Sequence, residues 1–256
     1  MAYIGEWKLL GDFGDVLVVL AFVSALVSFI SYAISGNTED ESWKSIGRKA
    51  WMTHVFSVLG IIFVLFLLLL NHRYEFAYVS KHLNNEMPMR YILSCFWEGQ
   101  EGGFLLWMFW HVVLGTVITR TSGRWEARVM TIFALVQFML SSMIQGVYFG
   151  DFQFGMNPFL LVRELPESIG LPWTYVETYL TDFPQFADGR GLNPLLQNYW
   201  MTIHPPTVFL GFAATLVPFS FAAAGLWKKE YHQWMKPALP WAFFGVCILG
   251  LGILMG

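Results

Sequence analysis

Six stretches of the sequence are apolar over about the length needed to cross a lipid bilayer. They cover residues 15–35, 51–70, 102–119, 129–150, 206–227 and 238–256. A membrane-spanning helix requires about 20 mostly apolar residues. Moreover, 56% of all residues are hydrophobic and only 13% are charged, which is more apolar surface than one soluble core normally buries. The sequence therefore predicts an all-α, polytopic membrane protein with about six transmembrane helices in a single domain, residues 1–256.

The distribution of lysine and arginine predicts the orientation of these helices. Three short loops, after the first, third and fifth stretches, hold most of the positive charge: Lys44, Arg48, Lys49, Arg120, Arg124, Arg128, Lys228, Lys229 and Lys236. The connections 71–101 and 151–203 are longer and hold fewer basic residues. Because basic loops stay on the cytoplasmic side, we expect a protein of the inner (cytoplasmic) membrane whose two long connections and N-terminus face outward.

Charge and cysteine content argue against several functional classes. A net charge of −3 without a run of basic residues is not typical of a nucleic-acid-binding protein, so no nucleic-acid partner is expected. Cys95 and Cys247 are far apart and form no CxxC pair, so a thiol redox motif is absent from the sequence. The apolar stretches contain no Asp or Glu other than Asp15, which argues against proton pumping. A non-catalytic scaffold or transport subunit of a membrane complex remains an alternative.

Polar side chains inside the predicted spans allow two interpretations. Gln137, Ser141, Gln145 and Tyr148 fall on one face of a helix, where they form either an interhelical hydrogen-bond seam or part of a substrate path. His111 lies in the middle of the third stretch, where an imidazole either bonds within the bundle or has a function.

The segment Ile-His-Pro-Pro at 203–206 sets the backbone around one histidine. A residue before proline favours extended backbone, and proline suits the first turn of a helix. We therefore predict that His204 stands at the outer mouth of the fifth span, where a neutral imidazole is available as a metal ligand. A histidine that only caps the helix entry is the alternative. His72 and His82 lie in the first outward connection and are either interfacial or functional.

Four segments carry a resemblance to a known family. They are Asp-Gly-Arg-Gly-Leu-Asn-Pro-Leu-Leu-Gln at 188–197, Ile-His-Pro-Pro at 203–206, Tyr-Val-Ser-Lys-His-Leu-Asn at 78–84, and Trp-Glu-Gly-Gln-Glu-Gly at 97–102. Together they resemble the CcmF-type cytochrome c maturation (haem lyase) proteins of the CcmF/CcsA haem-handling family. Gln100 departs from the pattern, since several relatives have histidine there, so the resemblance implies no ligand role for it.

The resemblance implies a site and a set of partners. His204 would be an axial ligand to the iron of haem b, the substrate haem, with Pro205 and Pro206 positioning it and Trp97 lining the porphyrin. Haem would be held on the outer membrane face for thioether attachment to apocytochrome c. A haem chaperone or other maturation proteins would take part, and the reactivity would reside in the haem vinyl groups and the cysteine thiols. The outer tryptophans are alternatively an ordinary membrane-interface belt, with Trp97, beside the turn at 98–102, as the exception.

The family's second outer histidine and its tryptophan-rich loop are not found in this sequence. We therefore expect an N-terminal portion of a haem lyase that is inactive without a chain carrying the tryptophan-rich loop. Either that chain is separately encoded or the sequence is a truncation. No residue of this chain is predicted to act as a catalytic nucleophile.

Overall fold

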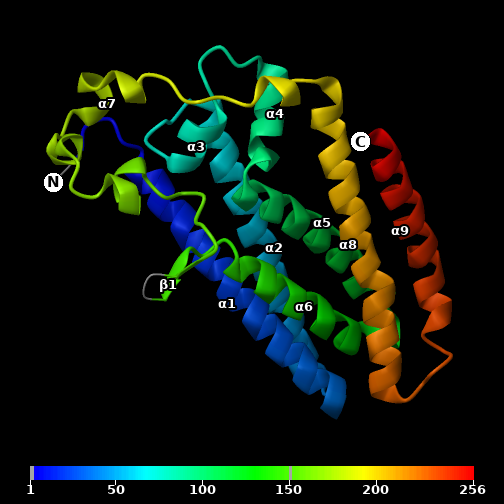
Figure 1. Cartoon of the computed structure of the whole chain (residues 1–256). Helices are drawn as coiled ribbons and strands as arrows, with labels where there is room; N and C mark the ends of the chain where they lie inside the picture. Colours follow the sequence, from blue (N-terminus) through cyan, green and yellow to red (C-terminus); the bar gives the residue numbers. More distant parts are fainter. Residues whose placement is uncertain (1–2, 150–151) are drawn as a thin grey trace.

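The computed structural model describes residues 3–149 and 152–256 and is a bundle of long helices capped at one end by shorter ones (Figure 1). Within the described residues, five helices are long and apolar enough to cross a membrane: α1 (Lys8–Thr38), α2 (Glu41–Leu70), α5 (Gln100–Thr121), α8 (Tyr199–Lys228) and α9 (Met235–Met255). Each contains most or all of one predicted apolar stretch. The predicted all-α, polytopic membrane fold is confirmed.

The first two helices form a hairpin because polar residues between them end one helix and begin the next. Glu39 adopts the left-handed conformation (φ 59°) at the end of α1. The Asp40 carboxylate then caps α2 by accepting a hydrogen bond from the Ser42 N–H at 2.7 Å. Farther along, the ring of Tyr32 lies directly on Gly47, where a Cβ atom would be only 2.9 Å from it. A glycine at that position lets the two helices approach closely.

The fourth predicted span is wrong in its C-terminal part. Helix α6 covers Glu126–Ser142, only 17 residues, and therefore ends well before residue 150. The apolar sequence continues as a hairpin of β1 (Val147–Phe149) and β2 (Phe152–Phe154), while Gly150 and Asp151 lie outside the described residues. Gly146 has a positive φ of 66°, which favours a turn there. A short apolar run does not distinguish helix from strand, so hydropathy alone extended the helix too far.

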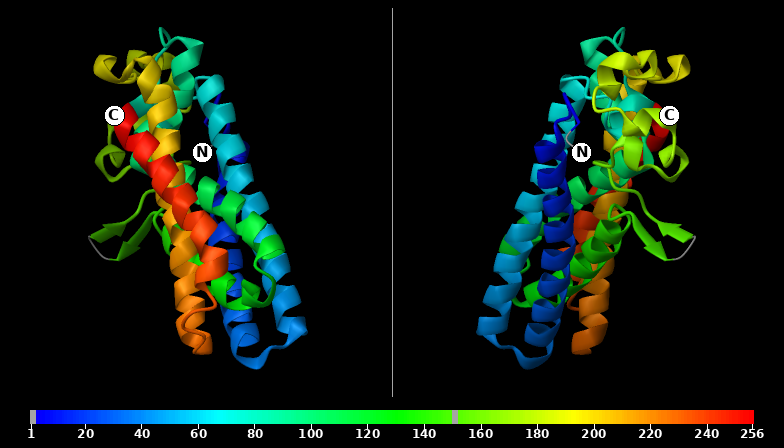
Figure 2. Two further views of the ribbon diagram at one scale, coloured as in Figure 1. Left: turned by 90° about the vertical axis from the view of Figure 1, so that its right-hand side faces the viewer. Right: turned by 90° about the vertical axis from the view of Figure 1, so that its left-hand side faces the viewer.

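Helix α6 nevertheless leads the chain back toward its starting end. Figures 1 and 2 show both termini in the upper half of the bundle, with the loop between α1 and α2 at the opposite end. An even number of passes through the bundle produces this arrangement. The predicted outward direction of the termini is a separate expectation that rests on the loop charges.

The polar face of α6 packs against neighbouring helices. His54 of α2 bonds through Nε2 to Oε1 of Gln137 and through Nδ1 to the backbone oxygen of Ala21, both at 2.9 Å. Gln145 lies beyond the end of α6, so the four predicted residues do not share one helix face; its amide donates to the Val18 oxygen at 2.9 Å. The Ser141 hydroxyl is buried without a hydrogen-bond partner among the described residues. These contacts agree with an interhelical seam. The side chain of Tyr148, the fourth residue of the predicted stripe, lies outside the described residues.

The two long connections fold over the upper end of the bundle. The first contains α3 (Ala77–His82) and α4 (Met89–Glu98). The second contains α7 (Tyr179–Asp182) and the short 3-10 turns Val162–Glu164, Pro166–Ser168, Pro172–Tyr175, Pro184–Phe186 and Pro194–Leu196; one more, Gly123–Trp125, lies between α5 and α6. Backbone bonds of 2.8 Å join them, from Ala77 N–H to the Leu160 oxygen and from Arg190 N–H to the Ser80 oxygen. The two connections are therefore joined to each other through α3.

Candidate functional site

The start of α8 differs from the prediction. The helix begins at Tyr199, capped by the Asn198 side chain, which accepts a hydrogen bond from the Met201 N–H at 3.0 Å. His204 therefore lies in the second turn, and Pro205 and Pro206 are inside the helix. The expectation that His204 stands before the helix mouth is wrong. The Asn198 cap starts the helix early, and this favourable cap outweighs the local preference of a residue before proline.

The prolines leave backbone oxygens of α8 without their usual partners. In an α-helix the N–H of residue i bonds to the oxygen of residue i−4, so Pro205 cannot pair with the Met201 oxygen. The indole N–H of Trp97 donates to that oxygen at 3.1 Å. Trp97 thus joins the end of α4 to the start of α8 and supplies the hydrogen bond that Pro205 removes. Its indole N–H is committed to the protein.

The His204 ring lies between α8 and the C-terminal turn of α9. Its Nδ1 is 2.9 Å from the backbone oxygen of Gly252. Because a carbonyl only accepts, Nδ1 carries the proton in this contact, and Nε2 of the neutral ring keeps its lone pair. The ring also lies against Gly256, where a Cβ atom would be 2.5 Å from His204 Cε1. This arrangement orients the imidazole and leaves one nitrogen as a donor atom for a metal.

The turn between α4 and α5 explains the glycines of the segment 97–102. A Cβ atom at Gly102 would lie 1.6 Å from the Phe96 oxygen, and one at Gly99 would lie 2.5 Å from the Tyr78 ring. The buried Tyr78 hydroxyl donates to the Phe96 oxygen at 2.6 Å and accepts from the Gly99 N–H at 3.3 Å. Gln100 is exposed at the first position of α5. The segment is therefore a tight turn held by the tyrosine of the first connection.

A groove runs between the α4–α5 turn and α8. It encloses about 570 Å³ and is lined by Trp97, Glu98, Gly99, Gln100, Gly103, Phe104, Trp107, Phe209, Phe212 and Thr215. The wall is largely aromatic, which is typical of sites for flat ligands. His204, Pro205 and Pro206 do not line it, because His204 contacts α9 and not α5. The structure thus places Trp97 and His204 on two sides of the start of α8.

Glu98 connects this groove to the segment 188–197. Burial raises the pKa of the Glu98 carboxyl above the ordinary value of 4.5, and the Asn193 backbone near it lowers the pKa by a smaller amount. Its Oε2 is buried without a hydrogen-bond partner among the described residues. Sequence reasoning missed Glu98, Tyr78 and Asn198. Only Asn198 carried a local signal, since asparagine commonly caps helices.

The other histidines occupy separate places. His82 bonds through Nδ1 to the Tyr78 oxygen at 2.7 Å, and burial lowers its pKa below 6.5. His72 adopts a positive φ of 51° at the end of α2. His111 is 1% exposed, and neither of its ring nitrogens has a hydrogen-bond partner among the described residues. In the part of the chain that the structure describes, no three His, Cys, Asp or Glu side chains gather as a metal site.

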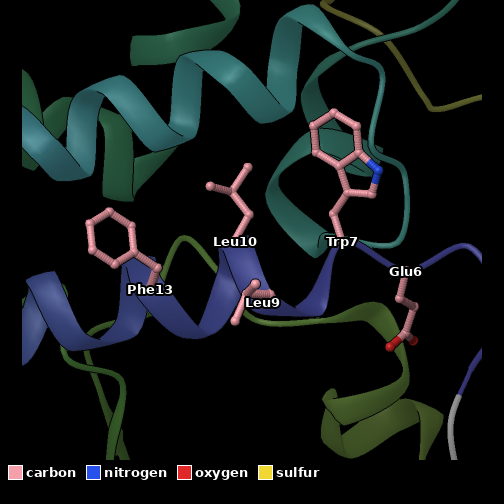
Figure 3. A pocket seen from close by; sticks show the side chains of 5 residues that line it. All are labelled: Glu6, Trp7, Leu9, Leu10 and Phe13. Atoms are coloured by element: carbon pink, nitrogen blue, oxygen red, sulfur yellow. The ribbon is translucent and has the colours of Figure 1, made fainter.

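A second groove lies at the N-terminal end of α1 (Figure 3). Trp7, Leu10 and Phe13 point to the same side of the helix, and Glu6 points away from them. The Glu6 carboxylate is bound by Arg163 and by the Tyr179 hydroxyl, each at 2.8 Å. This groove therefore offers apolar surface without a free charged group. It lacks the polar residues that orient a specific ligand.

Comparison with known proteins decides the family. The family model described as "Cytochrome C assembly protein" matches residues 97–256. The chain belongs to the cytochrome c assembly protein family. It is similar to "Cytochrome c-type biogenesis protein CcmF" of Pseudomonas fluorescens, with 28% identity over 254 residues, 96% of this chain and 34% of that protein. CcmF of Escherichia coli is 27% identical over 252 residues, again 96% of this chain and 34% of the relative.

The match to CcmF also extends to the fold. The solved structure of "Cytochrome c Heme Lyase CcmF" has a TM-score of 0.71 and 19% sequence identity, covering 98% of this chain and 36% of that one. This is a CcmF-type cytochrome c assembly protein, and the resemblance drawn from the four segments is confirmed. The chain spans about a third of the length of the CcmF relatives it matches.

Proposed function

We propose that this chain is the N-terminal part of a haem-handling unit and that His204 is an axial ligand to the iron of substrate haem b. The observation that carries the proposal is the orientation of the ring: the Gly252 oxygen holds the Nδ1 proton, and Nε2 keeps its lone pair. His204 as a whole is half-buried, and its Nε2 lies on the side of the ring that faces Gly256. A single histidine with a fixed tautomer suits a haem that is held and then released.

Pro205 and Pro206 have a positioning role in this proposal. They interrupt the hydrogen-bond ladder of α8 beside His204, and Trp97 replaces one of the lost bonds. Trp97 also lines the aromatic groove, so it either shelters the porphyrin directly or fixes the helix that carries His204. The chain's residues bind and orient haem, while the haem vinyl groups and the cysteine thiols of apocytochrome c supply the reactivity.

The proposal requires a second portion. The sequence has no tryptophan-rich loop, and His204 has no second outer histidine beside it among the described contacts. We propose that a chain or segment carrying that loop completes the site, together with apocytochrome c and a haem chaperone or other maturation proteins. The orientation with termini and long connections outside, at the inner membrane, follows from the loop charges and belongs to the same proposal.

An optical spectrum of the assembled complex tests the function. The chain is expressed with its tryptophan-rich partner, purified from membranes, and its haem content is compared with that of His204→Ala and His204→Gly. Both variants are expected to lose haem absorbance, and added imidazole should restore it in His204→Gly. The control is His232→Ala, an exposed histidine in the loop between α8 and α9.

Two results contradict the proposal. Unchanged haem content in His204→Ala rules out the ligand role, and absence of haem from the complete assembly favours the alternative, a non-catalytic scaffold or transport subunit.

A further inference from the structure

A small polar pocket lies at the end of the bundle opposite the termini, where α1, α2, α6 and α8 meet. It encloses about 260 Å³ and is lined by Ser35, Glu39, Glu41, Lys44, Arg124, Ala127, Arg128 and Lys228. The four cationic residues come from three helices and from the 3-10 turn between α5 and α6. Positive side chains from distant parts of the sequence therefore converge on one space. The proposed haem site, at the other end of α8, is not involved.

Three of the four cations facing this pocket are more buried than the two glutamates that line it, and the fourth, Arg124, is 54% exposed. The side chains of Lys44, Arg128 and Lys228 are 17%, 11% and 16% exposed, whereas those of Glu39 and Glu41 are 71% and 75% exposed. Exposed carboxylates contribute little to binding a charge, because solvent screens the pair and the side chain remains mobile. Lys44 is paired with Glu41 at 2.9 Å, but that carboxylate is exposed to solvent, so the pair compensates the lysine charge only in part.

Arg128 is the least satisfied of these residues. Its contact with Glu39 is 3.4 Å, and its Nε is buried with no hydrogen-bond partner among the described residues. Gly36 makes room for its stem, because a Cβ atom there would be 3.1 Å from Arg128 Cγ. A buried guanidinium N–H normally has an acceptor. Its position beside the pocket indicates that the acceptor belongs to a ligand.

Two of these cations, Arg124 and Lys228, contact the buried ring of Trp125, which is not itself part of the pocket lining. Trp125 is 4% exposed, with the Arg124 guanidinium 5.0 Å and the Lys228 ammonium 5.6 Å from its ring. Arg124 and Lys228 also share one carboxylate, that of Glu230, at 2.7 and 3.6 Å. One carboxylate cannot neutralise two cations. The pocket keeps positive charge after its internal ion pairs are counted.

A buried carboxylate close to the pocket is already occupied. Glu126 lies 4.0 Å from the Lys44 ammonium, but both of its oxygens are bound by Arg48, which does not line the pocket. Glu126 therefore offsets the charge of Arg48. The four lining cations share three other carboxylate partners, Glu41 (2.9 Å from Lys44), Glu39 and Glu230, which leaves one positive charge without a counterpart.

The position of the pocket along the membrane-spanning helices indicates where a bound anion would come from. Lys44 is in the first turn of α2, Arg128 in the first turn of α6, and Lys228 is the last residue of α8. In helices that cross a bilayer, these ends lie at the level of the lipid headgroups. The three loops at this end hold nine basic residues against five acidic ones, Glu39, Asp40, Glu41, Glu126 and Glu230. An anionic phospholipid reaches this position laterally.

We propose that this pocket binds the phosphate headgroup of an anionic phospholipid, with Arg128, Lys44 and Lys228 as its cationic ligands. The bound lipid links the ends of α2, α6 and α8 and holds the bundle at a defined depth. Basic pockets between membrane helices are known to select such lipids. The proposal is independent of haem binding, because it concerns the opposite end of the molecule.

Native mass spectrometry of the full chain, released from nanodiscs of phosphatidylcholine mixed with phosphatidylglycerol, tests the proposal. The wild type is expected to retain phosphatidylglycerol in preference to phosphatidylcholine. Arg128→Gln and Lys228→Gln should each reduce retained phosphatidylglycerol about fivefold relative to the control variant, because each removes a cation that contacts the headgroup. The control Lys49→Gln removes the same charge from an exposed position of α2 that does not line the pocket.

Three results overturn the proposal. Equal retention of the two lipids by the wild type shows that the pocket does not select anionic lipid. Equal loss in Lys49→Gln and in both pocket variants shows that only overall charge matters. A third arm adds inorganic phosphate alone: displacement of the lipid at millimolar phosphate identifies a free anion and not a headgroup. If one pocket variant does not fold, the other provides the comparison.

Discussion

The hydrogen bond between Trp97 and Met201 gives a quantitative test of how the prolines of α8 are tolerated. Trp97→Phe keeps the aromatic ring but removes the N–H that lies 3.1 Å from the Met201 oxygen. Leaving that oxygen unpaired costs about 1–3 kcal/mol. For a chain of this size each kcal/mol corresponds to about 2–4 °C, so the unfolding midpoint should fall by about 2–12 °C.

Pro205→Ala should remove most of that cost. Replacing the proline by alanine restores the N–H that pairs with the Met201 oxygen in a regular helix, so the oxygen keeps a partner without the indole. The double variant Trp97→Phe/Pro205→Ala is therefore expected to lose much less stability than the two single effects predict. A double-mutant cycle isolates this coupling, because the packing loss caused by the smaller ring is the same in both backgrounds.

The assay is thermal unfolding of the purified chain in one detergent at fixed pH, followed by far-UV circular dichroism, which reports helix content. Trp200→Phe is the control. Trp200 is an exposed tryptophan of α8, the helix that contains Met201 and Pro205, and its indole donates no hydrogen bond among the described residues. If Trp97→Phe lowers the midpoint equally in the wild-type and Pro205→Ala backgrounds, the Trp97 bond does not compensate for the proline. The explanation for how α8 accommodates Pro205 would then be refuted.

Three further predictions concern the short helices and turns that cap the bundle near the termini, and they use the same unfolding assay. Because burial raises the pKa of Glu98, the charged carboxylate destabilises the folded protein. Glu98→Gln should therefore be more stable than wild type at pH 8, and this gain in stability should vanish below pH 4.5. A stability difference that does not depend on pH contradicts this prediction. Burial lowers the His82 pKa, so wild type should lose stability as pH falls below 6.5, and His82→Asn should lose less. Gly102→Ala should be strongly destabilising, by more than about 3 kcal/mol, because its Cβ would overlap the Phe96 oxygen; Gly103→Ala, 3.7 Å from its nearest contact, should be neutral or stabilising.

Much of the fold could be predicted from the sequence because bilayer-spanning helices obey simple rules of length and apolarity. Five of the six apolar stretches lie largely within helices long enough to cross a membrane. The remaining stretch, residues 129–150, was predicted wrongly at its C-terminal end, because α6 ends at Ser142 and a turn begins at Gly146. Hydropathy reports which residues avoid water, and it does not report the backbone conformation of the few residues beside a turn.

The candidate site was only partly predictable. The sequence singled out His204, Pro205, Pro206 and Trp97, and the family match supports the resemblance on which they depend. It placed His204 wrongly, because the start of α8 depends on the Asn198 cap. It also could not show that Trp97 donates to α8, a contact between residues more than 100 positions apart.

The sequence by itself determined the membrane fold class, the family and the charge asymmetry of the loops. These properties are local, since apolar length, motif identity and loop charge are read from consecutive residues. Only the tertiary structure decided that the Gly252 oxygen fixes the His204 tautomer, that Trp97 satisfies the oxygen freed by Pro205, and that Arg128 faces a cationic pocket. Each depends on helices from different parts of the chain meeting. The physical reason is that hydrogen bonds and buried charges are satisfied by whichever groups packing brings within about 3 Å.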